Sequence, residues 1–191
     1  MRLAYPDSYV VLGEWRVSPS AGTFRDVMSR FPTGVVVVTT RVADDDFALS
    51  ASSFTSVSLD PLLVLICVQQ DTGFHNAITS AGDWAVNVLP EDGGEHADWF
   101  AHNGRPMPKG TDQVHRSESS NLLYVTDAVA HLECRTQQIH QAGDHDIVIG
   151  EVLDAHVASE DMPLVYWKSR YHEGLTQTDP FPPQAATRAP E

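Results

Sequence analysis

The sequence predicts a mainly β fold, an antiparallel barrel with a few short helices. Seven or eight segments have the length and composition of strands, against three short helical segments. Turn residues recur between the strands, and strands and helices do not alternate regularly, which argues against a parallel α/β sheet. Because so many antiparallel strands would leave unpaired edges in an open sheet, a closed or nearly closed barrel is favoured.

The N-terminal part predicts an extended arm over residues 1–19, followed by a helix. Ser20 is a suitable N-cap, and the apolar side chains after it follow helical spacing, i, i+3, i+4 and i+7: Phe24, Val27, Met28 and Phe31. Pro32 cannot continue a helix and ends it. A β-branched strand is expected next, over residues 35–40.

A stretch rich in hydroxyl groups is the most unusual part of the chain. The next strand starts at Phe47 and enters residues 50–58, which contain six serine or threonine side chains. Asp60 and Pro61 then separate it from residues 62–68, an apolar run typical of a buried strand. So many hydroxyls cannot all face a core without partners. They line either an exposed sheet edge or a polar ligand with phosphate and hydroxyl groups.

The remaining elements continue the β pattern to the C-terminal region. They are expected as a short helix (74–81), a strand (84–89), a short helix (95–102), a long surface loop (103–120), a hairpin (129–139 and 146–157) and a short strand (164–167). Residues 176–191 are rich in Pro, Gln, Thr and Ala, which predicts a flexible tail. The 191 residues and a hydrophobic content of 42% fit one domain, over residues 20–175.

Charge and cysteine content restrict the partners and the compartment. The formal net charge of −14 argues against nucleic acid or an anionic membrane as a partner, because both would repel this surface. No apolar run approaches the roughly 20 residues that span a bilayer, and the N-terminus has no secretory signal pattern. Cys67 and Cys134 stand in apolar or alternating runs and are expected to be free thiols, which suits the cytoplasm.

Motifs for several common chemistries are absent. The chain has no glycine-rich dinucleotide motif, no P-loop and no GxSxG elbow. His140 and His145 flank one turn beside Asp144 and Asp146, which would be the best metal site. Because neither HxH nor HExxH occurs, no metal is expected.

Several motifs together resemble the short-chain flavin reductases, which have the FMN-binding split-barrel fold. These motifs stand in the family's order: FPTGVVVVTT (31–40), SASSFTSVSLDP (50–61), WAVNVL (84–89), LEC (132–134), GDH (143–145), IGEV (149–152), PLVY (163–166) and RY (170–171). The resemblance implies a homodimer that reduces FMN or FAD with NADH or NADPH. Hydride would pass from nicotinamide C4 to flavin N5, and the reduced flavin would go to a partner monooxygenase.

The resemblance also implies site residues. The flavin ring and ribityl chain would lie against Thr33, Gly34, Ser50, Ala51, Ser52 and Ser53. The phosphate would lie near Ser56, Ser58 and Leu59. Phe100 would cover the flavin, and His145, supported by Tyr171, would position the nicotinamide.

The residue types fit this chemistry, but alternatives remain open. Hydride transfer between two cofactors needs no nucleophile and little acid–base help. On sequence alone, His145 is also explained as a solvated turn residue, Phe100 as core and Tyr171 as packing at the barrel end. Ala48 and Leu62 differ from the family's usual residues, so a split-barrel protein that binds flavin or haem without turnover is the alternative function.

Overall fold

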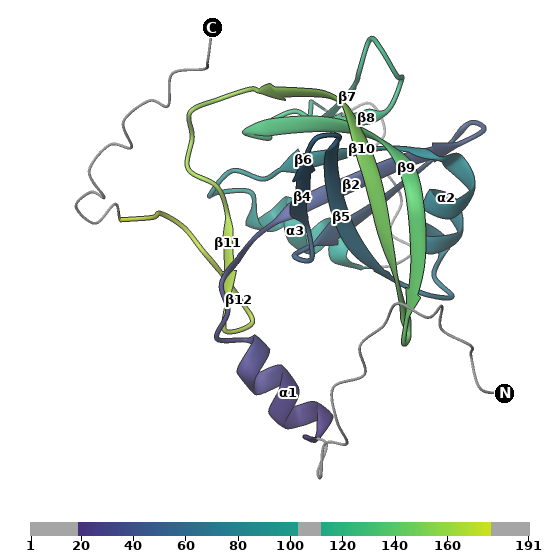
Figure 1. Ribbon diagram of the computed structural model, residues 1–191. Coiled ribbons are helices and arrows are strands. Elements are labelled where there is room, and N and C mark those ends of the chain that lie inside the picture. Colours follow the sequence, from purple (N-terminus) through teal and green to yellow (C-terminus); the bar gives the residue numbers. More distant parts are fainter. Residues whose placement is uncertain (1–18, 103–111, 177–191) are drawn as a thin grey trace, which may run out of the picture.

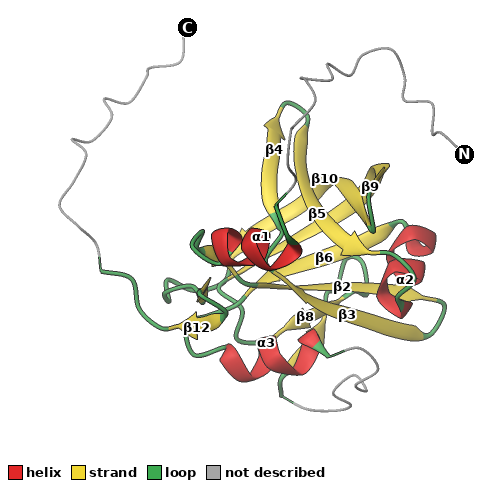
Figure 2. Ribbon diagram, turned by 90° about the horizontal axis from the view of Figure 1, so that it is seen from below, coloured by secondary structure: helices red, strands yellow, loops and turns green. Residues whose placement is uncertain are grey.

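The computed structural model describes residues 19–102 and 112–176 and confirms a mainly β, antiparallel fold with short helices (Figures 1 and 2). The helices are α1 (Ala21–Met28), α2 (Gly73–Ala81) and α3 (Gly94–Ala101). The strands are β1 (Thr33–Gly34), β2 (Val36–Val42), β3 (Asp45–Ala51), β4 (Thr55–Leu59), β5 (Leu62–Gln69), β6 (Asp83–Val88), β7 (Val114–Arg116), β8 (Leu123–Val125), β9 (Ala130–Ala142), β10 (His145–Val157), β11 (Val165–Trp167) and β12 (Arg170–His172). The predicted arm (1–19) and tail (176–191) lie outside the described residues, apart from residues 19 and 176.

Seven antiparallel strands form the main sheet, in the order β3-β2-β6-β9-β10-β5-β4. The two edge strands, β3 and β4, are consecutive in the chain and are joined by residues 52–54 alone. Three residues span only about 10 Å. The sheet must therefore curl until its edges approach each other, and Figure 2 shows this curvature.

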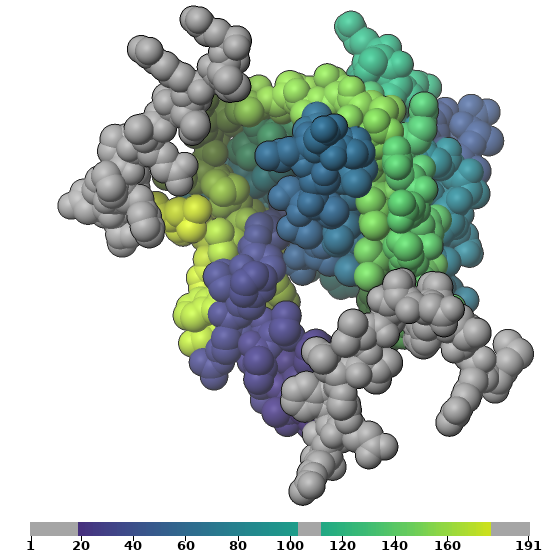
Figure 3. All heavy atoms as spheres, in the orientation of Figure 1, coloured from purple at the N-terminus to yellow at the C-terminus, as the bar shows by residue number. Residues whose placement is uncertain are grey.

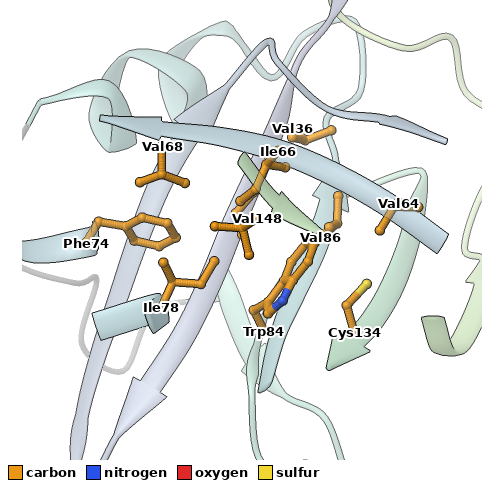
Figure 4. Packing of buried hydrophobic residues seen from close by; sticks show 11 residues of the cluster. Val36, Val64, Ile66, Val68, Phe74, Ile78, Trp84, Val86, Cys134 and Val148 are labelled. Carbon is orange, nitrogen blue, oxygen red and sulfur yellow. The ribbon is translucent and has the colours of Figure 1, made fainter. Parts of the chain in front are cut away.

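Strand β2 is buried on both faces, which explains its run of valines. Val36 and Val38 point into the main core inside the barrel, which α2 closes with Phe74 and Ile78. Figure 4 shows this cluster around the fully buried Trp84. Gly150 on β10 gives the indole its space, because a Cβ there would overlap the Trp84 ring.

A second core lies between the other face of β2 and α3. Val35 and Val37 pack there with Leu89, Ala97 and Phe100. The helix predicted over residues 95–102 is therefore the cover of this face of the sheet.

Helix α1 stands apart from the barrel (Figures 1 and 3). The predicted cap is present, since Ser20 Oγ accepts a hydrogen bond from the Thr23 N–H at 3.1 Å. The helix ends at Met28, before the Phe31 that the apolar spacing had included. Its apolar side chains are exposed, with Phe24 58% and Val27 63% accessible. Burial of an apolar face does not explain this helix in the described chain.

The expected loop over residues 103–120 is partly wrong. Residues 103–111 lie outside the described chain, but β7 pairs with β8 in a two-stranded ladder. Strands of three residues are too short for alternation to reveal them. Glu133 explains the position of this hairpin, because its buried carboxylate accepts hydrogen bonds from Ser117, Ser120 and Tyr124.

Candidate active site

A groove with a volume of about 890 Å³ lies between α1, β1, the residues before β4 and the β11–β12 turn. Figure 3 shows the hollow beside α1. Aromatic, hydroxyl and cationic side chains share its wall. The lining residues include Phe24, Arg25, Phe31, Thr33, Gly34, Ser52, Ser53, Phe54, Cys67, Tyr166, Trp167, Lys168 and Ser169.

A smaller hollow of about 190 Å³ adjoins this groove, because Ser52 and Tyr166 line both. The smaller one reaches along β3 to α3 and β12. Its other lining residues are Val35, Ser50, Ala51, Ala101 and Tyr171. The two hollows therefore bring together most of the residues that the resemblance assigned to the flavin.

Part of the hydroxyl stretch has a structural explanation. Ser50 Oγ donates to the Ala97 carbonyl of α3 at 2.7 Å. Ser53 Oγ bonds the N–H and the carbonyl of Cys67, each at 3.1 Å, and so continues the attachment of the β4 edge to β5. Ser58 Oγ accepts the Asp60 N–H at the turn into β5. Ser53 and Ser58 thus replace missing ladder and turn hydrogen bonds, and Ser50 attaches α3 to β3.

Thr33 differs from these residues. Its Oγ1 is buried and has no hydrogen-bond partner in the described chain, although it lines the groove. A buried hydroxyl without a partner is unfavourable, and native structures seldom retain one without a reason. The Thr33 hydroxyl and the neighbouring exposed Ser52 are therefore the polar groups best placed to meet a ligand.

Four of the residues predicted to contact the flavin lie outside both hollows. Ser56, Ser58 and Leu59 belong to edge strand β4, where Leu59 is 87% exposed. Phe100 is only 6% exposed and packs in the second core. Their roles toward the phosphate and the flavin ring stay predictions.

His145 stands at the tight β9–β10 turn, as the GDH motif predicted. Its Nδ1 lies 2.8 Å from Asp144 Oδ1, and hydrogen bonding to His145 lowers the pKa of that carboxyl below its usual range. In the β5–β10 ladder, Gln69 is opposite His145 and Cys67 is opposite Ile147. Since opposite residues share a face and residues two apart do too, His145 and the groove-lining Cys67 are on the same face of the sheet. His145 itself does not line the groove.

The turn that presents His145 is held from two sides. The Gln70 N–H donates to the Asp144 carbonyl at 3.0 Å, and Gln70 Nε2 donates to Asp146 Oδ1 at 2.6 Å. His75 of α2 contacts Asp146 Oδ2 at 2.8 Å. Hydrogen bonds from His75 and then Gln70 lower the pKa of Asp146. The sequence did not predict these hydrogen bonds to Asp146, because Gln70 and His75 are far from Asp146 in the chain.

Other chemistries find little support in the described residues. Residues 19–102 and 112–176 contain no group of three or more His, Cys, Asp or Glu side chains placed to hold a metal ion. Cys67 is the thiol in the groove wall, and burial raises its pKa, so it is protonated at neutral pH. None of the described helices is long and apolar enough to cross a membrane.

Comparison with known proteins agrees with the geometry. Residues 28–175 match the family model for the flavin reductase like domain. The chain is 42% identical over 136 residues to an NADH-dependent FAD reductase of Streptomyces globisporus, covering 69% of this chain and 73% of the relative. It is 36% identical over 160 residues to an NADH flavin reductase of Kitasatospora aureofaciens, covering 83% and 84%.

Solved structures show the same fold. The Streptomyces globisporus NADH:FAD oxidoreductase, solved with NAD and FAD fragments, superposes with a TM-score of 0.79 at 34% identity, covering 87% of this chain and all of that one. The flavin reductase component of a bacterial two-component tryptophan halogenase gives a TM-score of 0.77 at 32% identity, with 83% and 100% covered. The resemblance found in the sequence motifs is thus confirmed, and the chain belongs to the flavin reductase like family.

Proposed function

We propose that this chain reduces FMN or FAD with NADH and supplies the reduced flavin to a partner monooxygenase. The family match and the relatives support an oxidoreductase of this type. Support for a partner comes from a 31% identical relative, the reductase component of an FADH₂-dependent resorcinol hydroxylase of a Rhizobium species. Its name pairs a reductase with a separate oxygenase.

The observation that favours the groove as the flavin site is the buried Thr33 hydroxyl, which has no hydrogen-bond partner among residues 19–102 and 112–176. A flavin ring offers carbonyl and ring-nitrogen acceptors along one edge, and Thr33 and Ser52 could donate to them. The aromatic side chain of Tyr166, which lines both hollows, supplies flat apolar surface for the ring. Such a wall, mainly apolar with a few directed polar groups, is typical of cofactor sites.

The bound flavin supplies the hydride-accepting chemistry, and the chain supplies binding and orientation. His145 is the candidate for positioning the nicotinamide, because its ring is half-exposed and is held by Asp144. The hydrogen bonds of Gln70 and His75 to Asp146 limit the motion of this turn. Fixing the two rings in a reactive arrangement accounts for the acceleration without a proton-transfer residue.

A direct assay tests the proposal. Purified protein is mixed with NADH or NADPH and with FMN or FAD, and nicotinamide absorbance is followed. We expect oxidation above the background, with NADH as a donor. If none of the four pairs gives oxidation, the chain is a non-catalytic binder, and the proposed reaction is refuted.

A Thr33→Val variant tests the place of the flavin. Valine keeps the volume and removes a hydroxyl that bonds nothing in the described chain, so the fold should be unaffected. Loss of one hydrogen bond to the ligand predicts a flavin KM about three- to tenfold higher. An unchanged flavin KM would remove Thr33 from the site.

A homodimer is part of the same proposal. Exposed apolar side chains outside the groove lie on α1 and on the β4–β5 hairpin, a pattern typical of a surface that a second copy covers: Val27, Val57, Leu59 and Leu62. Light scattering on the purified protein would contradict this by reporting only the monomer mass of 21.0 kDa.

We also retain the cytoplasm as the expected compartment. Cys67 and Cys134 are free thiols, whereas disulfides are usual in oxidising compartments. Recovery of the native protein from a secreted fraction would contradict this location.

A further inference from the structure

The cations of the described chain fall into two groups. Arg41, Arg116 and Arg135 form ion pairs with aspartates. The other basic residues of the described ranges are Arg25, Arg30, Lys168 and Arg170, and none of these forms an ion pair or a side-chain hydrogen bond there. These four cations are exposed and are not neutralised by a carboxylate in the described chain, although the protein has a net charge of −14.

The segments that carry these four cations meet at one end of the groove, and two of the four cations line it. The Lys168 N–H donates to the Ser29 carbonyl at 2.9 Å, and Trp167 Nε1 donates to the Arg30 carbonyl at 3.1 Å. Arg25 is one helical turn before Ser29, so it is on the α1 face nearest the turn. Both Arg25 and Lys168 line the groove. Arg170 is opposite Trp167 in the β11–β12 ladder and so shares its face.

The backbone of the β11–β12 turn points to a role for the lysine side chain. Lys168 and Ser169, the two residues between the strands, have φ values of 49° and 59°. Two-residue hairpins of this type strongly prefer Asn-Gly or Gly-Gly, because other side chains are strained at positive φ. This turn instead has a lysine whose Nζ lies 4.3 Å from the centroid of the Trp167 ring, at the groove wall.

We propose that Lys168 and Arg25, with Trp167 beside them, form a subsite for the pyrophosphate-linked adenosine of a dinucleotide. The inference rests on the proposed function, in which FAD and NADH both have this ADP moiety. Two cations match the two phosphate charges, and the indole, which has Lys168 Nζ over its ring, adds aromatic surface against which adenine can pack. The net negative charge of the chain repels such a ligand at long range, so a local positive patch is required to hold it.

The volume of the groove agrees with this assignment. At about 890 Å³ it is near the upper end of the roughly 300–1,000 Å³ of ligand sites. Thr33 and Ser52 mark one part of the wall and Lys168 another, which leaves room for a ligand longer than a mononucleotide.

Titration of the full-length protein with ADP alone, followed by calorimetry, tests the subsite without any need for turnover. We expect Lys168→Asn to raise the Kd for ADP about tenfold, while Lys168→Arg stays within about twofold of wild type. Asn tolerates positive φ better than Lys, so the Asn variant should fold at least as well. Arg135→Gln, which removes an exposed ion pair with Asp83 outside both hollows, is the matched control and should not change the Kd.

Steady-state kinetics with the same variants identifies the source of the ADP moiety. A KM in Lys168→Asn that rises for FAD but not for FMN supports the subsite and assigns it to the flavin. A KM that rises for NADH, with FMN as acceptor, supports it and assigns it to the nicotinamide cofactor. Unchanged ADP affinity, or an equal rise for FMN and FAD with NADH unaffected, overturns the proposal. Absence of NADH oxidation with every flavin rejects the reductase function alone, because the ADP titration still decides the subsite.

Discussion

Acid should destabilise the protein through one buried histidine, His131 on β9. Its side chain is 2% exposed, and Nδ1 donates to Asn87 Oδ1 at 2.9 Å. That oxygen also accepts the Val125 N–H, so the histidine is part of the anchor of β8. Tyr124 stacks on the imidazole with ring centroids 4.2 Å apart. Protonation would place a charge in this enclosed stack.

The size of the effect follows from the proton affinity in the two states. Burial first, and then the nearby His156 and His115, lower the pKa of His131 from its ordinary 6.5 to about 4. Between these pH values the unfolded chain binds a proton that the folded chain does not, so stability falls as the pH falls. At 1.36 kcal/mol per pKa unit, the free energy of unfolding falls by about 3 kcal/mol in total, and most of this loss is reached by pH 4.5. Above about pH 6.5 the contribution is constant.

Urea unfolding followed by tryptophan fluorescence at pH 7 and pH 4.5 measures this loss. The variant His131→Phe keeps a ring against Tyr124 and cannot be protonated, while Asn87 Oδ1 retains the Val125 N–H. We expect the free energy of unfolding to fall about 2 kcal/mol less in this variant than in wild type. His140→Phe, on the exposed end of β9, is the control and should behave as wild type. The same acid-induced loss in wild type and His131→Phe would refute the reasoning.

Two further predictions concern the core and the nicotinamide. Gly150→Ala forces a Cβ into the Trp84 indole, and such overpacking predicts a destabilisation of about 1–3 kcal/mol, measured by urea unfolding; an unchanged midpoint would contradict it. His145→Ala should raise the NADH KM more than it changes flavin affinity, and Asp146→Asn should act in the same direction but less strongly, because it weakens the contact with His75. Equal effects on NADH and flavin in steady-state assays would argue against both roles.

The sequence predicted the long elements of the fold well, because their patterns are physical consequences of burial. Strand β5 has alternate side chains in the barrel core, and β2 is buried on both faces, as a continuous β-branched run predicts. The short strands β7 and β8 were missed. Their position depends on hydrogen bonds to Glu133, and no local pattern reveals contacts between distant residues.

Prediction of the site was also limited because local sequence patterns do not reveal contacts between distant residues. Thr33, Ser52 and Tyr171 were assigned by motif, and the structure brings them to adjoining hollows. The position of Lys168 could not be predicted from the sequence. Lys168 lines the groove together with Arg25 because the β11–β12 turn bonds to the residues that follow α1, contacts across about 140 residues of chain. The unusual Lys-Ser pair in a two-residue turn was the one local signal of this part of the groove.

The serines and threonines of residues 50–58 have two roles: some bond to main-chain atoms, and others line the groove. Strands β3 and β4 are opposite edges of the sheet, so residues 52–54 must cross where no neighbouring strand continues the ladder. Backbone groups at such a crossing need side-chain partners, which explains why Ser53 bonds to the N–H and carbonyl of Cys67 on β5. The same gap leaves space for a ligand, where Ser52 remains exposed. The closure of the barrel thus requires hydroxyl side chains and creates the groove at the same point.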